Sequence, residues 1–333
     1  MAKSIEEIRA MLLAKKEGNG GGNGAQRGPD SFLAFWNIPE RQALNLRFLP
    51  DADTENPFFW RERDMINIPF TGVKGVHTDK VTVSVPCNEM WDKVNTCPVL
   101  KEVRTWWNSG DKELEEMARV YWKKKSYLLQ CLIAPNSVEV KDDQAPENPI
   151  RRVLVTKQLF AKIESIMLDP DLVDMPTDYT NGLDFRVVKS KNSGGFNSYD
   201  ESKFAMKPRE LNADEMAAIE KYGLFNLNDF MPKRPSEDEL AAIAEMFEAS
   251  LKGEAYDPDR WAQFYRPAGV SKPGNGNSNT GSAPATEAKP TPAQTPAPAS
   301  TPAVEAQEPA QEAKSAPADQ NALLARLRAQ RGG

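Results

Sequence analysis

Short runs of apolar and β-branched residues, several alternating with polar ones, dominate the chain between Phe32 and about Lys207. The runs are LNLRFLP (44–50), MINIPF (65–70), KVTVSVP (80–86), YLLQCLIAP (127–135), RRVLVT (151–156) and LDFRVVKS (183–190). Alternation with a period of two is typical of strands that bury one face, and Gly, Pro, Asn and Asp clusters separate the runs. The pattern predicts a mainly β core, either a small barrel or a sandwich.

Other segments follow the helical period of 3.6 residues. Residues 111–122 and 157–168 interrupt the strands, which favours an α+β fold or an elaborated barrel over strict βαβ alternation. Residues 212–223 and 236–253 each begin with a capping residue, carry Glu three positions later and end at Gly. We therefore expect residues 210–268 to form a helical segment.

The N-terminal residues 1–28 predict an amphipathic arm on a glycine-rich tether. The apolar residues at helical spacing are Ile5, Ile8, Met11 and Leu12. A helix this short is marginally stable alone, so we expect it to dock on a partner. A frayed terminus is the alternative.

The C-terminal residues 269–333 have a composition that predicts disorder. Pro, Ala, Thr, Ser and Gln dominate there, and such a chain buries too little apolar surface to fold. Only NALLARLRAQR (321–331) is expected to form a helix, on contact with a partner.

The formal net charge of −6 hides a segregation of charge. Residues 1–209 are balanced, whereas residues 210–260 hold 13 acidic and 5 basic residues. A neutral body can still carry a basic groove, because affinity for nucleic acid depends on local charge near the phosphates.

Several classes of protein are disfavoured. No apolar run is long enough to cross a membrane, and the acidic residues near the N-terminus argue against a secretion signal. Three cysteines favour a reducing cytoplasm over a disulfide framework. With one histidine, no phosphate-binding glycine motif and no prominent carboxylate cluster, we do not expect an enzyme.

Aromatic and basic residues interleave at the start of one predicted strand. The segment reads Tyr121, Trp122, Lys123, Lys124, Lys125, Ser126 and Tyr127, and a second group holds Lys189, Lys191, Phe196 and Tyr199. Single-strand binding needs ammonium groups that follow phosphates and ring faces on which bases stack without sequence choice. The alternative is a solvated lysine run beside core aromatics.

A possible metal site is the second constellation. His77 precedes Cys87 by ten residues, and Cys97 follows ten residues later. A structural zinc ion takes four ligands, and Leu100 stands where a second cysteine of a short CxxC element would be. Two ordinary cysteines and a surface histidine are the alternative.

Taken together, several motifs resemble the family of T-even bacteriophage single-stranded DNA-binding, helix-destabilising proteins. The matching motifs, in the family order, are RFLP (47–50), the cysteine spacing with CPV (97–99), KKKSY (123–127), APEN (145–148) and GGFNSYDESKF (194–204). YDESKF is the most specific of them. The resemblance covers roughly residues 44–207.

The resemblance implies an OB-fold core over 29–209, with a zinc-finger-like subdomain inserted at about 64–105. It also implies a basic, aromatic-lined cleft that holds single-stranded DNA by its backbone. The residues that it places there are Lys123, Lys124, Lys125, Ser126, Tyr127, Phe196 and Tyr199, with Tyr121 or Trp122 as a further ring and Lys189 and Lys191 nearby.

The chain departs from the family pattern at three places. Leu100 replaces the fourth zinc ligand, so one Zn²⁺ per chain on His77, Cys87 and Cys97 would need another group, and loss of the metal is slightly favoured. The basic N-terminal cluster shrinks to Lys3 and Ser4, so self-association is expected through these residues with Ile5 and Ile8. The C-terminal tail is nearly neutral instead of acidic.

The resulting hypothesis is a sequence-independent, cooperative binder that coats single-stranded DNA during phage replication, recombination and repair, in the cytoplasm of the infected bacterium. Its expected partners are single-stranded DNA, copies of itself, and replication and recombination proteins that contact the C-terminal region. An OB-fold interaction adaptor without strong DNA binding is the alternative, and a nuclease is disfavoured by the missing histidines and acidic clusters.

Overall fold

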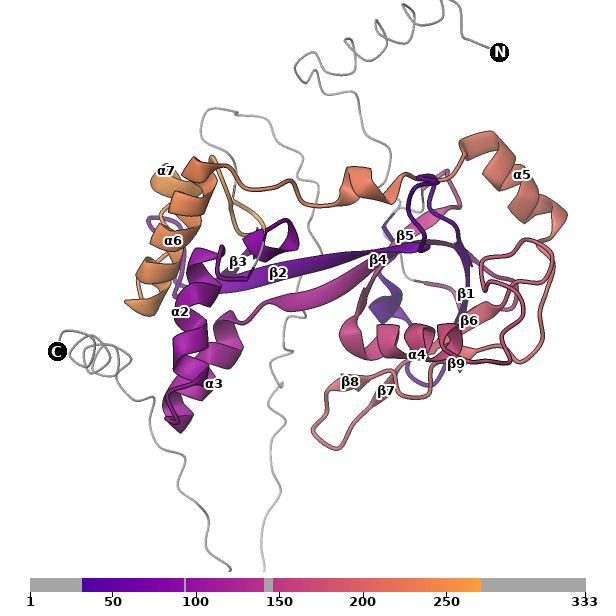
Figure 1. Ribbon diagram of the computed structural model, residues 1–333, viewed down its shortest axis with the longest axis horizontal. Helices are drawn as coiled ribbons and strands as arrows, with labels where there is room; N and C mark the ends of the chain where they lie inside the picture. The colour runs from indigo at the N-terminus through magenta and orange to yellow at the C-terminus, as the bar shows by residue number, and fades with distance from the viewer. Residues whose placement is uncertain (1–31, 93, 141–145, 271–333) are drawn as a thin grey trace, which may run out of the picture.

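Two lobes share one antiparallel sheet in the computed structural model, which describes residues 32–92, 94–140 and 146–270 (Figure 1). The seven strands run in the order β3-β2-β4-β1-β6-β9, with β5 also paired to β4. They are β1 (Ala43–Leu49), β2 (Trp60–Phe70), β3 (Val81–Pro86), β4 (Lys124–Ile133), β5 (Arg151–Thr156), β6 (Asp184–Val188) and β9 (Lys203–Phe204). The hairpin of β7 (Ser190–Lys191) and β8 (Asn197–Ser198) stands apart. The expected α+β class is confirmed, and the structure shows that the strand pairs of the sheet are antiparallel.

Helices cover both ends of this sheet. They are α2 (Pro98–Trp107), α3 (Lys112–Tyr121), α4 (Lys157–Met167), α5 (Ala213–Tyr222), α6 (Glu237–Leu251) and α7 (Pro258–Trp261), with the 3₁₀ turns η1 (Phe35–Asn37), η2 (Asn88–Met90) and η3 (Leu227–Phe230). Both expected capping boxes form, at the starts of α5 and α6. Helix α2 was not predicted, although Pro98 at its first turn and its apolar positions suit a helix.

The strand lobe contains β1, β5, β6, β9, α4 and the second half of β4. Its core is rich in aromatic rings: Phe48 lies 5.5 Å from Phe185 and 5.9 Å from Phe59, centroid to centroid. Leu129 and Val153, which face each other across β4 and β5, are fully buried with them. Alternation of buried and half-buried residues along β5 shows why its sequence reads as a strand.

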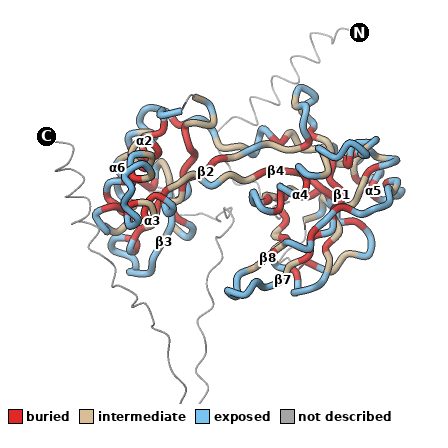
Figure 2. Tube along the Cα trace, turned by 60° about the horizontal axis from the view of Figure 1, so that its bottom comes forward, coloured by how far each residue is buried: buried red, intermediate tan, exposed pale blue. Residues whose placement is uncertain are grey.

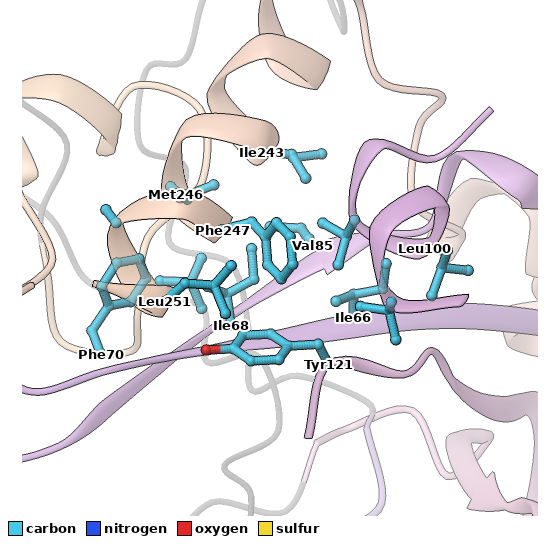
Figure 3. Packing of buried hydrophobic residues seen from close by; sticks show 14 of the residues in the cluster. Ile66, Ile68, Phe70, Val85, Leu100, Tyr121, Ile243, Met246, Phe247 and Leu251 are labelled. Carbon is cyan, nitrogen blue, oxygen red and sulfur yellow. The ribbon is translucent and has the colours of Figure 1, made fainter. Parts of the chain in front are cut away.

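The helical lobe packs β3, α2, α3 and α6 around the far half of β2 (Figure 3). Ile66, Ile68 and Phe70 alternate along β2 and point into this core, where Leu100 and Phe247 meet them. Helix α6 therefore completes a core whose members on β2, β3, α2 and α3 precede it by more than a hundred residues. This lobe is broader than the expected insertion at 64–105.

Strands β2 and β4 run from one lobe into the other, and buried positions along them appear in both lobes (Figure 2). Along this bridge Trp60 pairs with Leu129 at one end and Met65 with Lys124 at the other. The two cores are thus built on the same pair of strands.

A strap of residues 223–236 links α5 to α6 and follows one face of this bridge (Figure 1). The Gln130 side chain donates to the Phe225 carbonyl at 2.9 Å and accepts from the Phe225 N–H at 2.9 Å. The Leu227 N–H donates to Asp51 at 3.0 Å, and the Arg152 guanidinium lies 3.7 Å above the Phe230 ring. These contacts hold the strap against the strand lobe.

Candidate nucleic-acid interface

The face of the bridge opposite the strap carries lysines and carboxylates. Residues that oppose each other across an antiparallel pair share a face, so the register places Glu62 beside Tyr127 and Asp64 beside Lys125. We name as the lysine face the residues Trp60, Glu62, Asp64, Lys123 and Lys125. The lysine face lies where β2 and β4 pass from one lobe into the other.

Each lysine of this face holds a carboxylate. Lys125 Nζ lies 2.5 Å from a Glu62 oxygen, which raises the pKa of Lys125 above its ordinary value. Lys123 Nζ lies 2.8 Å from Asp64 and 3.9 Å from Glu89. Because Glu62 is half exposed, a phosphate could replace it beside Lys125 without opening the core.

Glu89 anchors the helical end of the lysine face. Arg104 donates to both of its carboxylate oxygens, at 2.7 and 2.6 Å. Burial alone would raise the pKa of Glu89, but the bonds from Arg104 and the Asn95 N–H hold it below its ordinary value. The same guanidinium lies 5.8 Å above the Trp122 ring. Lys123 is therefore positioned by a rigid, charged support.

Lys124 and Ser126 differ from the expected placement in one cleft with Lys123 and Lys125. Successive side chains of a strand point to opposite faces, so Lys124 and Ser126 lie on the strap side. The Lys124 side chain is exposed, whereas the Ser126 hydroxyl donates to the Arg63 carbonyl at 3.4 Å. The run of three lysines is thus divided between two surfaces.

Tyr121 lies in the core of the helical lobe, not in a cleft. Helix α3 continues through Tyr121, so the extended conformation that would align it with Lys123 does not form there. Its ring is 4% exposed and its hydroxyl shares a 2.8 Å hydrogen bond with Ser250. Trp122 is half-buried and packs at the edge of the same core.

Tyr127 also differs from the expectation of a free stacking ring. Its ring is 6% exposed and stacks on Phe160 of α4, with the two planes 6° apart. Because Tyr127 belongs to the part of β4 that α4 covers, its ring faces are already occupied.

The second group of predicted residues lies on and beside the β7–β8 hairpin. Phe196 is 71% exposed and Lys191 is exposed, so both are open to a ligand. Tyr199 instead packs edge-on against Phe35 at 5.4 Å, and Lys189 Nζ donates to the Trp36 carbonyl at 2.7 Å. The hairpin thus contributes one free ring and one free cation.

Of the four positions considered for zinc, Cys87, Cys97 and Leu100 lie in one core, and His77 does not join them. Cys87 and Cys97 are buried and their thiols share a hydrogen bond, which together with burial raises the pKa of Cys87. Leu100 is fully buried in the same core, whereas His77 lies on an exposed turn. In the described part of the chain, no three His, Cys, Asp or Glu side chains are placed to hold a metal ion. These residues do not fit a structural zinc site.

A groove of about 1290 Å³ lies away from the lysine face, between α4, the loop after it and β9. Its basic residues are Arg41, Lys162, Arg186 and Lys203, and acidic residues such as Asp169 and Asp171 also line it. Its lining, like the lysine face, mixes basic and acidic side chains. Among the residues that the structure describes, no helix is long and apolar enough to span a membrane.

Comparisons with known proteins place the chain in a family. A family model described as "gp32 DNA binding protein like" matches residues 42–249. The chain belongs to this family. It is 27% identical over 252 residues to the single-stranded DNA-binding protein of Enterobacteria phage T2, covering 73% of this chain and 76% of that protein. The corresponding protein of Enterobacteria phage T4 is 28% identical over 254 residues, covering 73% and 75%.

The gp32-like match extends beyond the strands into α6, which ends at Leu251. The acidic residues 210–260 therefore fall largely inside the family region. Sequence reasoning missed the partners Glu62, Asp64 and Glu89, since a strand pattern gives no sign of which carboxylate lies across from which lysine. The self-association residues Lys3, Ser4, Ile5 and Ile8 and the tail after residue 270 lie outside the described residues.

Proposed function

We propose that this protein binds single-stranded DNA without sequence preference, coating it during phage replication, recombination and repair. The lysine face carries the proposal, because it offers partly exposed ammonium groups on strands beside aromatic rings. Family membership and the two phage relatives support the same ligand. The proposal needs no catalytic step, since bases stacked on protein are unavailable for pairing.

Titration of a labelled oligonucleotide at low and high salt tests this function. Counterion release predicts that the affinity falls as salt rises, with a slope of about 0.7 per neutralised phosphate on a log–log plot. A matched duplex is the control and should bind more weakly. Affinity for the single strand that is absent, or that is independent of salt, would contradict the proposal.

For the fold, the proposal is that the strand lobe is an OB-fold and that the helical lobe is its inserted subdomain. Support comes from the family membership and from β4, which pairs with β1, β2 and β5 as a central strand of a curved sheet would. An experimental structure in which the strand lobe stays an open sheet would contradict it.

We also propose that the helical lobe is stable without zinc. Leu100 supplies apolar contacts where a ligand would stand, and α6 buries Ile243, Met246 and Phe247 against the same core. Burial of each such side chain stabilises the fold by about 1.5–3 kcal/mol. Elemental analysis of purified protein should therefore give well under one zinc per chain.

Cooperative binding, partner recruitment and location complete the proposal. Residues 1–28 would contact the neighbouring copy on DNA, and the C-terminal region would recruit replication and recombination proteins. The site of action would be the cytoplasm of the infected host. Deleting residues 1–17 should weaken binding to long oligonucleotides more than to short ones, and equal effects on both would contradict the role of the arm.

A further inference from the structure

An exposed pair of aromatic rings lies where the lysine face begins. Phe58 is 51% exposed, and its ring stacks on Trp60 with centroids 4.7 Å apart and planes 26° apart. Trp60 in turn contacts Phe160 edge-on at 5.1 Å, which ties the pair to the strand-lobe core. One face of the stack rests on protein, and the outer ring remains open to solvent.

The loop that carries Phe58 is held by hydrogen bonds. The Asn56 side chain donates to Asp51 at 2.8 Å and to the Trp60 carbonyl at 3.2 Å. Its amide oxygen accepts from the Phe58 N–H at 3.2 Å. Asp51 is itself buried and fixed by Arg61 at 3.1 Å. Because the ring is already in place, little conformational entropy is lost when a ligand stacks on it.

The ring pair lies close to a phosphate-binding group. Trp60, Glu62 and Asp64 alternate along β2 and share one face, and alternate residues of a strand lie roughly 6.6 Å apart. Glu62 holds Lys125, so the ammonium group is one alternate position away from the rings. A base on Phe58 and its phosphate on Lys125 therefore suit one and the same strand of nucleic acid.

We propose that Phe58 and Trp60 form a stacking platform for an unpaired base, with the adjoining phosphate held by Lys125. The inference rests on the proposed function and names two residues of the site. A stacking face accepts any base, so the platform adds affinity without sequence choice. A base inside a duplex is already stacked on both sides, which gives preference for single strands.

The test compares substitutions at Phe58 with a matched control. The variants are Phe58→Ala, Phe58→Leu and Phe58→Tyr, and the control is Phe230→Ala, an aromatic ring that is 37% exposed on the strap side of the bridge. The dissociation constant for a labelled oligothymidylate is measured by fluorescence anisotropy. Because Phe58 is exposed, its three variants should keep the unfolding temperature of the parent protein within a few degrees. The unfolding temperature of Phe230→Ala, which loses the ring under Arg152, is measured alongside them.

Phe58→Ala and Phe58→Leu should weaken binding by roughly 5- to 150-fold, as expected for the loss of one stacked base. Phe58→Tyr, which keeps an aromatic ring, should lose less affinity than Phe58→Ala, and Phe230→Ala should bind like the parent protein. The salt dependence should be unchanged in Phe58→Ala, because no phosphate contact is lost. Parent-like affinity of Phe58→Ala would overturn the platform, as would an equal loss in Phe230→Ala.

Tryptophan emission gives a second readout. DNA should quench the emission of the parent protein, and Trp60→Phe should lose much of this quenching, because the tryptophan under the stacked base is removed. Unchanged quenching in Trp60→Phe would overturn the platform. If the parent protein fails to bind the oligonucleotide, the proposed function itself fails, so the two failures are distinguishable.

Discussion

The strand lobe and the helical lobe stabilise the same two strands by different means. In the strand lobe, β4 is paired along both edges, with β5 on one side and β1 on the other. In the helical lobe, the hydrogen-bonded ladder narrows to β2 and β3, and the core depends on side chains from α2, α3 and α6. One lobe is therefore held by backbone pairing over a core, and the other mainly by packing.

This difference bears on where DNA can be bound. A surface between two lobes can bind DNA in a defined geometry only if both of its ends are fixed. The lysine face is fixed at one end by Phe160 and at the other by Glu89 and Arg104. Since β2 and β4 belong to both cores, loosening one lobe should disturb the other. We expect the described body to unfold as one cooperative unit.

The largest effect is expected from truncating one core ring in each lobe. Phe247→Ala in the helical lobe and Phe185→Ala in the strand lobe should each lower the free energy of unfolding by about 3–5 kcal/mol. Both rings are almost completely buried. Urea titration followed by circular dichroism measures the loss.

Both variants should still unfold in a single transition. Two separate transitions in Phe247→Ala, with the strand lobe retained, would show that the lobes are independent in spite of their shared strands. Phe230→Ala at the exposed strap is the control and should change the free energy of unfolding by much less.

A smaller effect is expected at Glu89. Its lowered pKa means that the stabilisation is complete above about pH 4.5, the ordinary value, and is lost as the pH falls through the folded-state pKa. Glu89→Gln should lower the free energy of unfolding near pH 7 by about 1.5–3 kcal/mol, since it removes charged hydrogen bonds to Arg104.

Below pH 4.5 the difference between the Glu89→Gln variant and the parent protein should shrink. Denaturant titrations at pH 7, 5 and 3.5 measure it. A difference that grows toward low pH would contradict the assignment of the charge to Glu89.

Substitutions of the two partners of the Lys125–Glu62 ion pair should have small and opposite effects on the affinity for single-stranded DNA. Lys125→Ala should weaken single-strand binding and reduce the salt slope by about 0.7, because one phosphate contact is lost. Glu62→Gln should strengthen binding, because the phosphate no longer displaces a carboxylate from Lys125. Stability should change by less than about 1 kcal/mol in both, since the pair is exposed. Equal shifts in the same direction would show that Glu62 does not compete with DNA.

Removal of metal should have the smallest effect. Dialysis against a chelator should leave the unfolding temperature of the parent protein and of Leu100→Ala unchanged, although Leu100→Ala itself is destabilised by its cavity. A fall of several degrees in the parent protein after dialysis would show that Cys87 and Cys97 hold a metal after all.

Most strands of the sheet could be predicted from the sequence, but their order in the sheet could not. RRVLVT and LDFRVVKS contain β5 and β6 within a few residues, because alternation and turn residues are local signals. The extension of β2 back to Trp60 was missed, since WRERD is polar at positions whose partners lie on β4. Helix α2 was missed because Cys97, which precedes its first residue Pro98, was considered for a metal loop.

The site was predicted in its composition but only partly in its geometry. The segment of residues 121–127 does supply the lysines of the bridge, yet Tyr121 and Tyr127 belong to the two cores. An aromatic residue buried in a core and one on which a ligand stacks have the same local sequence pattern. Which role Tyr127 takes depends on Phe160, whose position is set by the packing of α4.

The position of α6 in the chain also matters while the protein is being made. Its contacts with Tyr121 and Phe70 join residues that leave the ribosome far apart in time. Until the strap and α6 have emerged, the apolar side of β2 and the inner side of α2 are covered only in part, by each other and by α3. Nascent chains of this protein should therefore expose apolar surface until late in synthesis. Truncation before residue 237 should yield a product that aggregates, not a smaller functional protein.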